Sequence, residues 1–262
     1  MKRGFTMIEL LVVIAVIAIL AAILLPVLVL GKDRALNAQC ISNEKQWGLL
    51  LRMYADDNHG YFMSGVSPIS GDGSHVAWVR SFTNEYERNP KLLLCPKATM
   101  RRGAGVPEVP TTLDDPNALA WGGAITAYTF YDPVDNVQLG SYGFNGWLYN
   151  AGTAILQGRS TVYNLRTEDI RETSQTPMLA DSMWRGAAPM ETEPPPAVDG
   201  EWDNGTNQMW VYTLARHTKG VNIIYLDGSV RHSRAKDLWQ LPWHKDWNYA
   251  SASGLTFPDW MN

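Results

Sequence analysis

The feature that most constrains this chain is an uncharged apolar run near its N-terminus, Leu10–Gly31. As an α-helix, a run of this length spans about 30 Å, which is the thickness of a bilayer core. The cations Lys2 and Arg3 precede it, which favours a cytoplasmic N-terminus. A cleaved signal peptide has a shorter apolar region followed by small residues at A-x-A spacing. This run continues without such a site, so we expect it to be retained as a transmembrane helix.

An acidic residue, Glu9, lies among the apolar residues that lead into this run. An ionised carboxylate at the edge of a membrane span is costly unless a cation pairs with it. Two explanations are open at this point. Glu9 lies among the lipid headgroups, or it pairs with a cation from another chain.

Residues 2–13 read Lys-Arg-Gly-Phe-Thr-Met-Ile-Glu-Leu-Leu-Val-Val. This segment resembles the class III leader of type IV pilins and type II secretion pseudopilins, with Met7 in place of the usual Leu. The resemblance implies cleavage after Gly4 by a prepilin peptidase and N-methylation of the new terminus at Phe5. It also implies that Glu9 pairs with the terminal amine of a neighbouring subunit, which would neutralise the buried charge.

One long helix is predicted from about Phe5 to Asp57. Pro26 matches a helix-weakening proline of many pilins, although a simple kink in a membrane helix explains it equally well. Beyond it, apolar residues recur on a single helical face, at Leu36, Cys40, Trp47, Leu51 and Tyr54. Asn58-His59-Gly60 predicts the end of the helix, because Asn and Gly accept the left-handed conformation of a C-cap.

The remainder of the chain predicts a β-rich head with long loops. Its clearest element is a hairpin of strands 220–226 and 229–232, joined by Asp227-Gly228 as a two-residue turn. Weaker expectations are strands at Val76–Val79 and Pro177–Ala180, a short helix from Thr167 to Ile170, and an exposed loop from Glu191 to Gly205. The predicted fold class is therefore α+β and pilin-like. Its predicted parts are a leader at 1–4, a membrane or filament-core half of the helix at 5–30, an amphipathic half at 31–58, and a head at 59–262.

A second resemblance concerns the head. His217, nine intervening residues and then Asp227-Gly228 resemble the H-x9-D-G element of a large group of bacterial pilin-like proteins. Other segments agree with that group in their order along the chain: Cys40-Ile41-Ser42-Asn43, Tyr54-Ala55-Asp56-Asp57-Asn58, Leu94-Cys95-Pro96, Ser141-Tyr142-Gly143-Phe144-Asn145 and Leu179-Ala180-Asp181-Ser182. This resemblance implies an architecture and an export route rather than an activity.

The two cysteines, Cys40 and Cys95, exclude a disulfide-dense miniprotein and a four-cysteine zinc site. Both lie on the exported side of the predicted membrane helix, where the compartment is oxidising. A bridge between them would close a loop of about 55 residues and stabilise the fold by about 4 kcal/mol. Two buried free thiols are the alternative.

Three residues of the head, Asp181, His217 and Asp227, are candidates for a metal or acid–base cluster, since carboxylates and an imidazole suit a divalent cation. The alternative is structural, with Asp227 explained by its turn and His217 bracing the hairpin. Ca²⁺ is the one cofactor considered, because several pseudopilins bind it in their heads. The acidic segments 56–60 and 199–205 nevertheless lack EF-hand spacing.

The sequence gives little support for catalysis, nucleic-acid binding or sugar binding. No nucleophile elbow, P-loop, Rossmann fingerprint or zinc-protease helix occurs, so we predict no catalytic residue. A net charge of −4 gives no sign of nucleic-acid binding. Two uses are open for the aromatic rings near the C-terminus, which either stack on sugars or fill a core or a subunit interface. These rings are Trp239, Trp243, Trp247, Tyr249 and Trp260.

The sequence therefore favours a structural subunit of a type IV pilus-like filament that is not an enzyme. Its expected partners are copies of itself, other pilin-like subunits, the prepilin peptidase and N-methyltransferase, and an inner-membrane assembly platform. We expect it in the bacterial inner membrane before assembly and in an extracellular or periplasmic filament afterwards. One alternative is a minor pseudopilin whose head binds a substrate or glycan. A membrane-tethered hydrolase using His217 and Asp227 is another.

Overall fold

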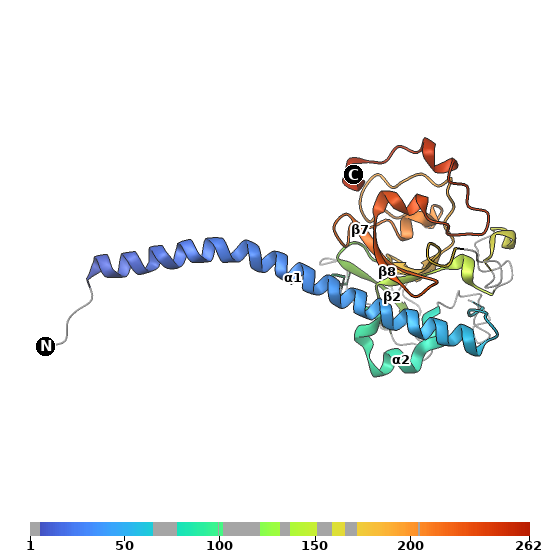
Figure 1. The fold of residues 1–262 in the computed structure, drawn as a ribbon, viewed down its shortest axis with the longest axis horizontal. Coiled ribbons are helices and arrows are strands. Elements are labelled where there is room, and N and C mark those ends of the chain that lie inside the picture. The colour runs from blue at the N-terminus through green and yellow to red at the C-terminus, as the bar shows by residue number, and fades with distance from the viewer. Residues whose placement is uncertain are drawn as a thin grey trace. The chain divides into compact units, whose positions relative to one another are not determined.

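The computed structural model describes residues 6–64, 78–98, 100–101, 121–131, 137–150, 159–165, 172–203 and 205–262. The chain divides into two compact units, Met1–Ala38 and Gln39–Asn262. The second unit includes the C-terminal part of the long helix, so the boundary between the two units lies within the helix and not at its end. An α+β fold with a long N-terminal helix and a β-rich C-terminal region is confirmed (Figure 1).

The long helix α1 runs from Met7 to Asp57 and continues past Pro26. Thr6 caps its start: the Thr6 N–H donates to Glu9 Oε2 at 2.8 Å, and the Glu9 N–H donates to Thr6 Oγ1 at 3.2 Å. This reciprocal pair is a capping box. The helix ends where it was predicted to end, with His59 and Gly60 at φ values of 57° and 84°.

Two sheets form the framework of the second unit. The larger has the strand order β6-β4-β5-β7-β8, antiparallel except for β6, which pairs parallel to β4. The smaller has the order β1-β2-β3. The strands are β1 Met100–Arg101, β2 Thr126–Tyr131, β3 Val137–Gly140, β4 Tyr142–Asn145, β5 Pro177–Asp181, β6 Gly186–Ala187, β7 Gly220–Tyr225 and β8 Val230–Arg234. Every residue of β4, β5 and β7 is buried, so these strands are covered on both faces.

Short helices lie before, between and after the strands. One of them, α2 at Thr83–Arg88, is α-helical. The others are 3₁₀ helices: η1 Trp78–Phe82, η2 Pro90–Leu93, η3 Gly146–Leu148, η5 Thr161–Tyr163, η7 Gln208–Val211, η8 Ala235–Gln240, η9 Ser251–Gly254 and η10 Asp259–Met261.

The C-terminal part of α1 packs through the predicted face. Cys40, Trp47 and Leu51 are fully buried. The Trp47 indole donates to the Leu92 carbonyl at 2.7 Å. Its ring also meets that of Trp78 edge-on at 4.7 Å. These contacts anchor this part of α1 in the core of the second unit.

The predicted hairpin is confirmed as β7 and β8, which lie side by side in Figure 1. Its turn is longer than predicted. The Tyr225 N–H donates to the Ser229 carbonyl, and Gly228 has a φ of 83°. Three residues therefore form the loop, as in a type I turn followed by a left-handed residue.

The weaker expectations had mixed outcomes. β5 confirms the strand predicted at Pro177–Ala180. The described part of Val76–Val79 is 3₁₀ helix rather than strand, because Trp78 and Val79 turn inward to fill the core. The helix predicted from Thr167 to Ile170 lies outside the described residues.

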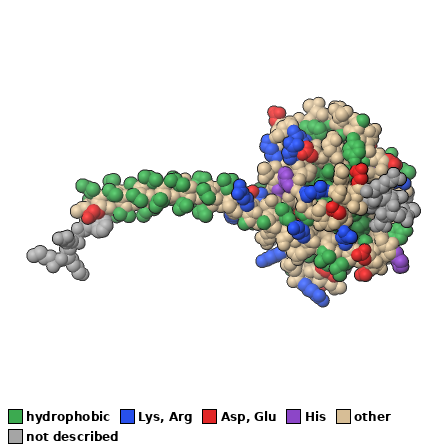
Figure 2. Space-filling view, viewed as in Figure 1, with side chains coloured by type: hydrophobic (Ala, Val, Ile, Leu, Met, Phe, Trp, Pro, Cys, Tyr) green, Lys and Arg blue, Asp and Glu red, His purple; other side chains and the backbone are tan. Residues whose placement is uncertain are grey.

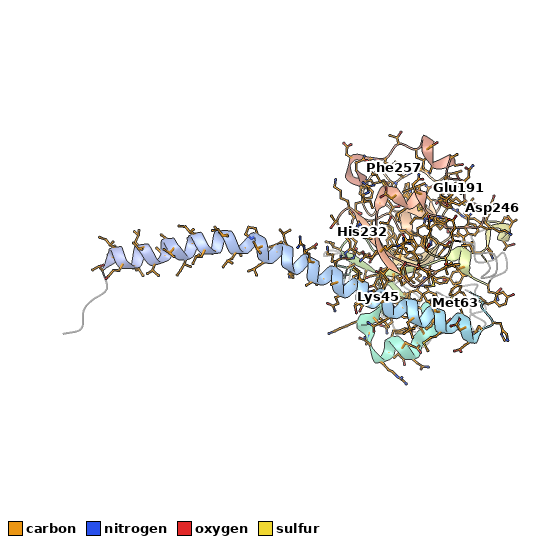
Figure 3. The ribbon with its side chains drawn as sticks, in the orientation of Figure 1. Lys45, Met63, Glu191, His232, Asp246 and Phe257 are labelled. Carbon is orange, nitrogen blue, oxygen red and sulfur yellow. The ribbon has the colours of Figure 1, made fainter. Side chains whose placement is uncertain are left out.

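The segment predicted as an exposed loop, Glu191–Gly205, is partly buried. The Glu193 carboxylate accepts hydrogen bonds from the backbone N–H groups of Gln208 and Met209 at 3.0 and 2.7 Å. Glu191, labelled in Figure 3, accepts from His244 Nε2 at 2.8 Å. This segment therefore holds other parts of the unit in place.

Most C-terminal aromatic rings fill the core. Trp239, Trp243 and Trp247 are between 0% and 8% exposed, which excludes their use as an open stacking surface. Among the described residues, Tyr249 and Trp260 of this group are the more accessible ones, since Tyr249 is 44% exposed and Trp260 is half-buried.

Candidate functional site

The N-terminal part of α1 presents a continuous apolar surface (Figure 2). Its large apolar side chains between Met7 and Leu30 are 46% to 86% exposed. Within the described residues, α1 is the one helix long and apolar enough to cross a membrane. Soluble monomers rarely expose apolar patches larger than a few hundred Å². This segment therefore needs lipid or other apolar helices around it.

Glu9 is the one acidic residue at the start of this segment. Besides the Thr6 N–H, the Thr6 hydroxyl donates to Glu9 Oε2 at 2.8 Å. The carboxylate thus has a local helix-capping role within its own chain. Gly4 and Phe5, the predicted processing residues, lie outside the described residues.

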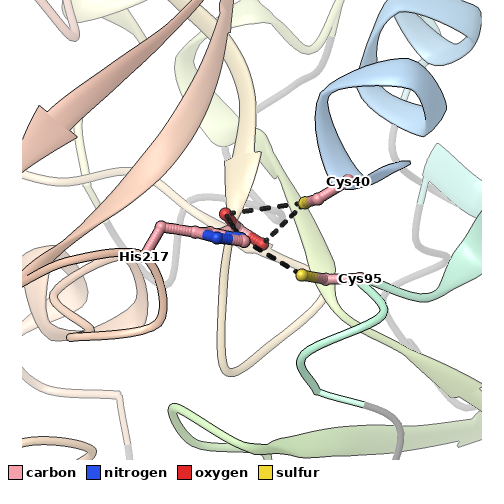
Figure 4. A group of neighbouring side chains, drawn as sticks. Cys40, Cys95 and His217 are labelled. Atoms are coloured by element: carbon pink, nitrogen blue, oxygen red, sulfur yellow. Dashed lines mark hydrogen bonds and ion pairs between the residues drawn. The ribbon is translucent and has the colours of Figure 1, made fainter. Parts of the chain in front are cut away.

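A second site lies inside the second unit. Cys40, Cys95, Asp181 and His217 are all buried, and one donor atom from each lies within 4.8 Å of the others. We call these four residues the buried cluster. Cys40 comes from α1, Cys95 from the loop after η2, Asp181 from the end of β5 and His217 from the loop before β7. Figure 4 shows Cys40, Cys95 and His217 pointing toward one another from three of these segments.

The distances within the buried cluster are those of direct contact. His217 Nε2 lies 3.2 Å from Cys95 Sγ and 3.2 Å from Asp181 Oδ2. Cys40 Sγ lies 3.7 Å from Asp181 Oδ1. It also lies 3.4 Å from the Tyr142 hydroxyl. Cys40 therefore contacts Asp181, Cys95 contacts His217, and the contact between Asp181 and His217 joins the two pairs.

Arg216 supports the buried cluster. Its guanidinium donates to Asp181 Oδ1 at 3.0 Å. Four further hydrogen bonds go to backbone carbonyls, those of Gly123, Ala124, Ser141 and Ser182. All five donors of this buried guanidinium are therefore occupied, which fixes the carboxylate in one orientation.

The pKa values of the groups in the buried cluster differ from those of the same groups in water. Burial alone would raise the pKa of Asp181, but Arg216, His217 and the Asn222 N–H outweigh it and lower that pKa to about 2. Burial would likewise lower the pKa of His217, yet contact with Asp181 and Cys95 raises it. Burial raises the pKa of Cys40. The fold therefore keeps Asp181 ionised in a site closed to solvent.

A strained turn places His217. Its backbone N–H and carbonyl both bond to Gly220, at 2.8 and 3.0 Å. The two residues between them, Thr218 and Lys219, have φ values of 44° and 62°. A β-branched residue rarely adopts positive φ, so the surrounding structure must hold this turn.

Another acid lies beside the buried cluster. Glu44, one helical turn after Cys40, is fully buried, and neither carboxylate oxygen has a hydrogen-bond partner among the described residues. Burial, together with the charges of Asp181 and Cys95, raises its pKa. Its exposed neighbour Lys45 is labelled in Figure 3. A carboxyl group without a partner calls for an explanation in the chemistry around it.

The structure brings together only some of the residues that the sequence suggested. Asp181 and His217 lie together, but Asp227 does not join them. His217 precedes β7 and Asp227 follows it, and an extended strand of this length separates its ends by about 20 Å. Asp227 instead stabilises its own turn, accepting from the Ser229 N–H at 2.8 Å. Cys40 and Cys95 lie close together as thiols that are not bonded to each other.

The arrangement is unlike a nucleophilic relay. A catalytic imidazole receives the nucleophile on one nitrogen and its orienting carboxylate on the other. Here Cys95 and Asp181 share Nε2, and His217 Nδ1 has no hydrogen-bond partner in the described part of the chain. Both sulfurs are fully buried, so a polymer substrate has no access to them.

Comparison with known proteins covers part of the chain. Residues 1–25 match the prokaryotic N-terminal methylation motif. The chain is 41% identical over 68 residues to the type IV wide pilus major component PilA4 of Thermus thermophilus, covering 26% of this chain and 52% of the relative. It is 38% identical over 60 residues to the type II secretion system core protein G of Escherichia coli, covering 23% of this chain and 41% of the relative.

The chain thus spans about half the length, or less, of these curated relatives. No solved structure matches it. One relative is named as a component of a pilus and the other as a core protein of a secretion system, and neither name describes an enzyme.

Proposed function

We propose that this chain is a structural subunit of a type IV pilus-like filament and polymerises through its N-terminal helix. The observation that carries the proposal is the apolar, exposed segment of α1, most of which lies within the methylation motif at residues 1–25. The same helices of neighbouring subunits can bury this apolar surface, and lipid can bury it equally well. The same segment therefore serves first as a membrane anchor and then as the core of a filament.

The steps of assembly follow from this proposal. The chain enters the inner membrane with Lys2 and Arg3 on the cytoplasmic side. A prepilin peptidase cleaves after Gly4, and the new terminus at Phe5 is methylated. An assembly platform then moves the helix out of the bilayer into a periplasmic or extracellular filament. Glu9 sets the register by pairing with the terminal amine of the adjacent subunit.

Glu9 also caps its own helix, so the test must separate charge from capping. Glu9→Gln removes the charge but keeps the capping box, because a capping box accepts either Glu or Gln at this position. Glu9→Ala removes both. We expect normal processing and no filaments from either variant. Normal filaments from Glu9→Gln, with none from Glu9→Ala, would show that Glu9 acts only as a cap.

The cleavage site has its own test. Gly4→Ala should leave the leader attached, which mass spectrometry of the membrane fraction detects. A mature mass unchanged from that of the wild-type chain would overturn the assignment of Gly4 and Phe5.

A minor pseudopilin in a type II secretion-like system is the second candidate, and the likeness to a secretion core protein supports the secretion role but not the low copy number. The two candidates differ in copy number, because a major subunit forms long filaments while a minor one supplies a few copies. The burial of Trp239, Trp243 and Trp247 argues against the glycan-stacking surface considered for such a head. The narrower likeness to the H-x9-D-G group also remains a proposal.

A further inference from the structure

We propose that Cys40, Cys95, Asp181 and His217 bind one Zn²⁺ ion that fastens the C-terminal part of α1 to the rest of the head. This proposal goes beyond filament assembly and does not depend on it.

The donor set selects the metal. Two thiolates, an imidazole and a carboxylate are all common zinc ligands. Sulfur donors favour zinc over calcium, because Ca²⁺ takes six to eight oxygen ligands. The Ca²⁺ site considered from the sequence included Asp227, which lies away from the buried cluster. The cation proposed here therefore differs from it in both identity and ligands.

The geometry is that of a tetrahedral site. Bond lengths of about 2.0 Å to nitrogen and oxygen and about 2.3 Å to sulfur place tetrahedral ligand atoms about 3.3–3.8 Å apart. With Asp181 Oδ2 as the ligand atom, His217 Nε2 lies 3.2 Å from Oδ2 and 3.2 Å from Cys95 Sγ, and Cys40 Sγ lies 4.0 Å from Oδ2. All four donor atoms lie within 4.8 Å of one another. Small shifts of the side chains would therefore bring them to the spacing that the ion requires.

The charges balance once the ion is bound. Two thiolates and the Asp181 carboxylate carry three negative charges. The ion supplies two positive charges and Arg216 supplies the third, through its contact with Asp181 at 3.0 Å. Glu44, buried beside the buried cluster, adds no charge to this balance, because burial raises its pKa and keeps the carboxyl group protonated.

The supporting contacts are those of a structural metal site. Protein groups that hold the ligands in place commonly surround such an ion. Arg216 and the Asn222 N–H hold Asp181, while the turn through Thr218 and Lys219 holds His217. Four protein ligands leave no open position for a substrate, which is typical of structural rather than catalytic zinc. The ligands come from four separate segments, so the ion would link α1 directly to β5 and to the loops before β7 and after η2.

A disulfide between Cys40 and Cys95 is the competing state of the same two sulfurs. It would consume both thiolates, so the disulfide and the zinc site exclude one another. Zinc binding leaves the sulfurs reduced, whereas the disulfide lowers the mass of the chain by two hydrogens. The two states can therefore be distinguished in one protein sample.

The experiment uses the full chain, extracted in detergent from cells that export it, without added reductant. Metal content by mass spectrometry should give one zinc per chain, and the denatured protein should have two titratable thiols. Replacing Zn²⁺ with Co²⁺ should give the intense visible bands of tetrahedral Co²⁺ and the near-ultraviolet charge-transfer band of cobalt–thiolate bonds. Loss of the metal to a chelator should lower the melting temperature, because the ion binds only the folded chain.

Cys95→Ala and His217→Ala should each lose stoichiometric zinc, whereas Asp227→Asn should retain one ion per chain. Asp227 is a matched control, because it belongs to the same sequence element as His217 but lies outside the buried cluster. The Co²⁺ spectrum of the unmutated chain keeps the test valid if a variant fails to fold. Absence of zinc overturns the proposal, whether the thiols are free or the mass shows a disulfide. Loss of zinc from a folded Asp227→Asn variant overturns the placement of the site.

Discussion

Replacing Arg216 with Ala removes the cation that holds the buried cluster together. The Arg216 and Asp181 side chains are both 0% exposed, and their contact is 3.0 Å long. The variant leaves Asp181 with one fewer partner in a site closed to water. It also removes the N–H groups that donate to four backbone carbonyls, so each of these carbonyls loses a hydrogen bond.

The size of the effect follows from these contacts. Breaking a buried ion pair by removing one partner costs about 3–5 kcal/mol. Each buried acceptor left without a donor costs about a further 1–3 kcal/mol unless water enters the cavity. We therefore expect Arg216→Ala to lower the free energy of unfolding by at least about 3 kcal/mol. Such a loss is a large fraction of the total for a domain, which is about 5–15 kcal/mol.

Urea unfolding of the full chain in detergent, followed by tryptophan fluorescence, measures this loss. A chelator in the buffer restricts the comparison to the ion pair. At a slope of about 2–3 kcal/mol per molar urea, the midpoint should fall by about 1 M or more. Arg216→Lys should fall between the variant and the parent, because it keeps the charge but loses the planar fork.

An exposed pair in the same protein provides the control. Arg234 donates to Asp237 at 2.6 Å, with the two side chains 58% and 39% exposed. Arg234→Ala should leave the midpoint almost unchanged, because water screens the pair. If Arg216→Ala moves the midpoint no further than Arg234→Ala does, the structural role assigned to Arg216 is wrong.

Two further predictions concern the core. Trp47→Ala should lower the free energy of unfolding by about 3–5 kcal/mol, while Leu49→Ala, 63% exposed on the same helix, should have little effect in the same urea assay. Equal midpoints for the two variants would contradict the packing of α1 described above. The buried His244 beside Glu191 has its pKa held below 6.5, because burial outweighs the carboxylate. As the pH falls, the unfolded chain therefore takes up a proton on His244 before the folded chain does. The contribution of His244 to the free energy of unfolding is fully present above the pKa of the unfolded chain, and it is lost as the pH falls through 6.5. Thermal melts from pH 7.5 to 5.5 should show this loss, and His244→Gln should reduce it; an unaltered pH profile in that variant would assign the loss to other groups.

The long helix and the hairpin were predictable because their signals are local. An uncharged run of apolar residues, followed by a face of buried residues, determines α1 from Met7 to Asp57. The apolar strand before Asp227-Gly228 determines β7 in the same way. The turn length was wrong because Asp-Gly suits both two-residue and three-residue loops, and only the pairing of Tyr225 with Ser229 distinguishes them.

The buried cluster could not be derived from spacing along the chain. Cys40 and Asp181 are far apart in the sequence, and the fold of four segments brings them together. Sequence reasoning missed Arg216 and Glu44 because charged residues are normally exposed, and nothing local marks these two as buried. The order of the short segments around Cys95 and Tyr142 was an available signal. Those segments line the buried cluster, so their grouping by family likeness could have indicated one shared site.

The central claim is that the N-terminal helix of this chain leaves the membrane to form the core of a filament. Electron cryo-microscopy of filaments sheared from the source cells tests it most directly. We predict density for this sequence beginning at Phe5, with helices packed at the filament axis and Glu9 beside the terminal amine of a neighbouring subunit. Cells that contain the chain only as an unassembled membrane protein, with Met1 to Gly4 still attached, would contradict the account.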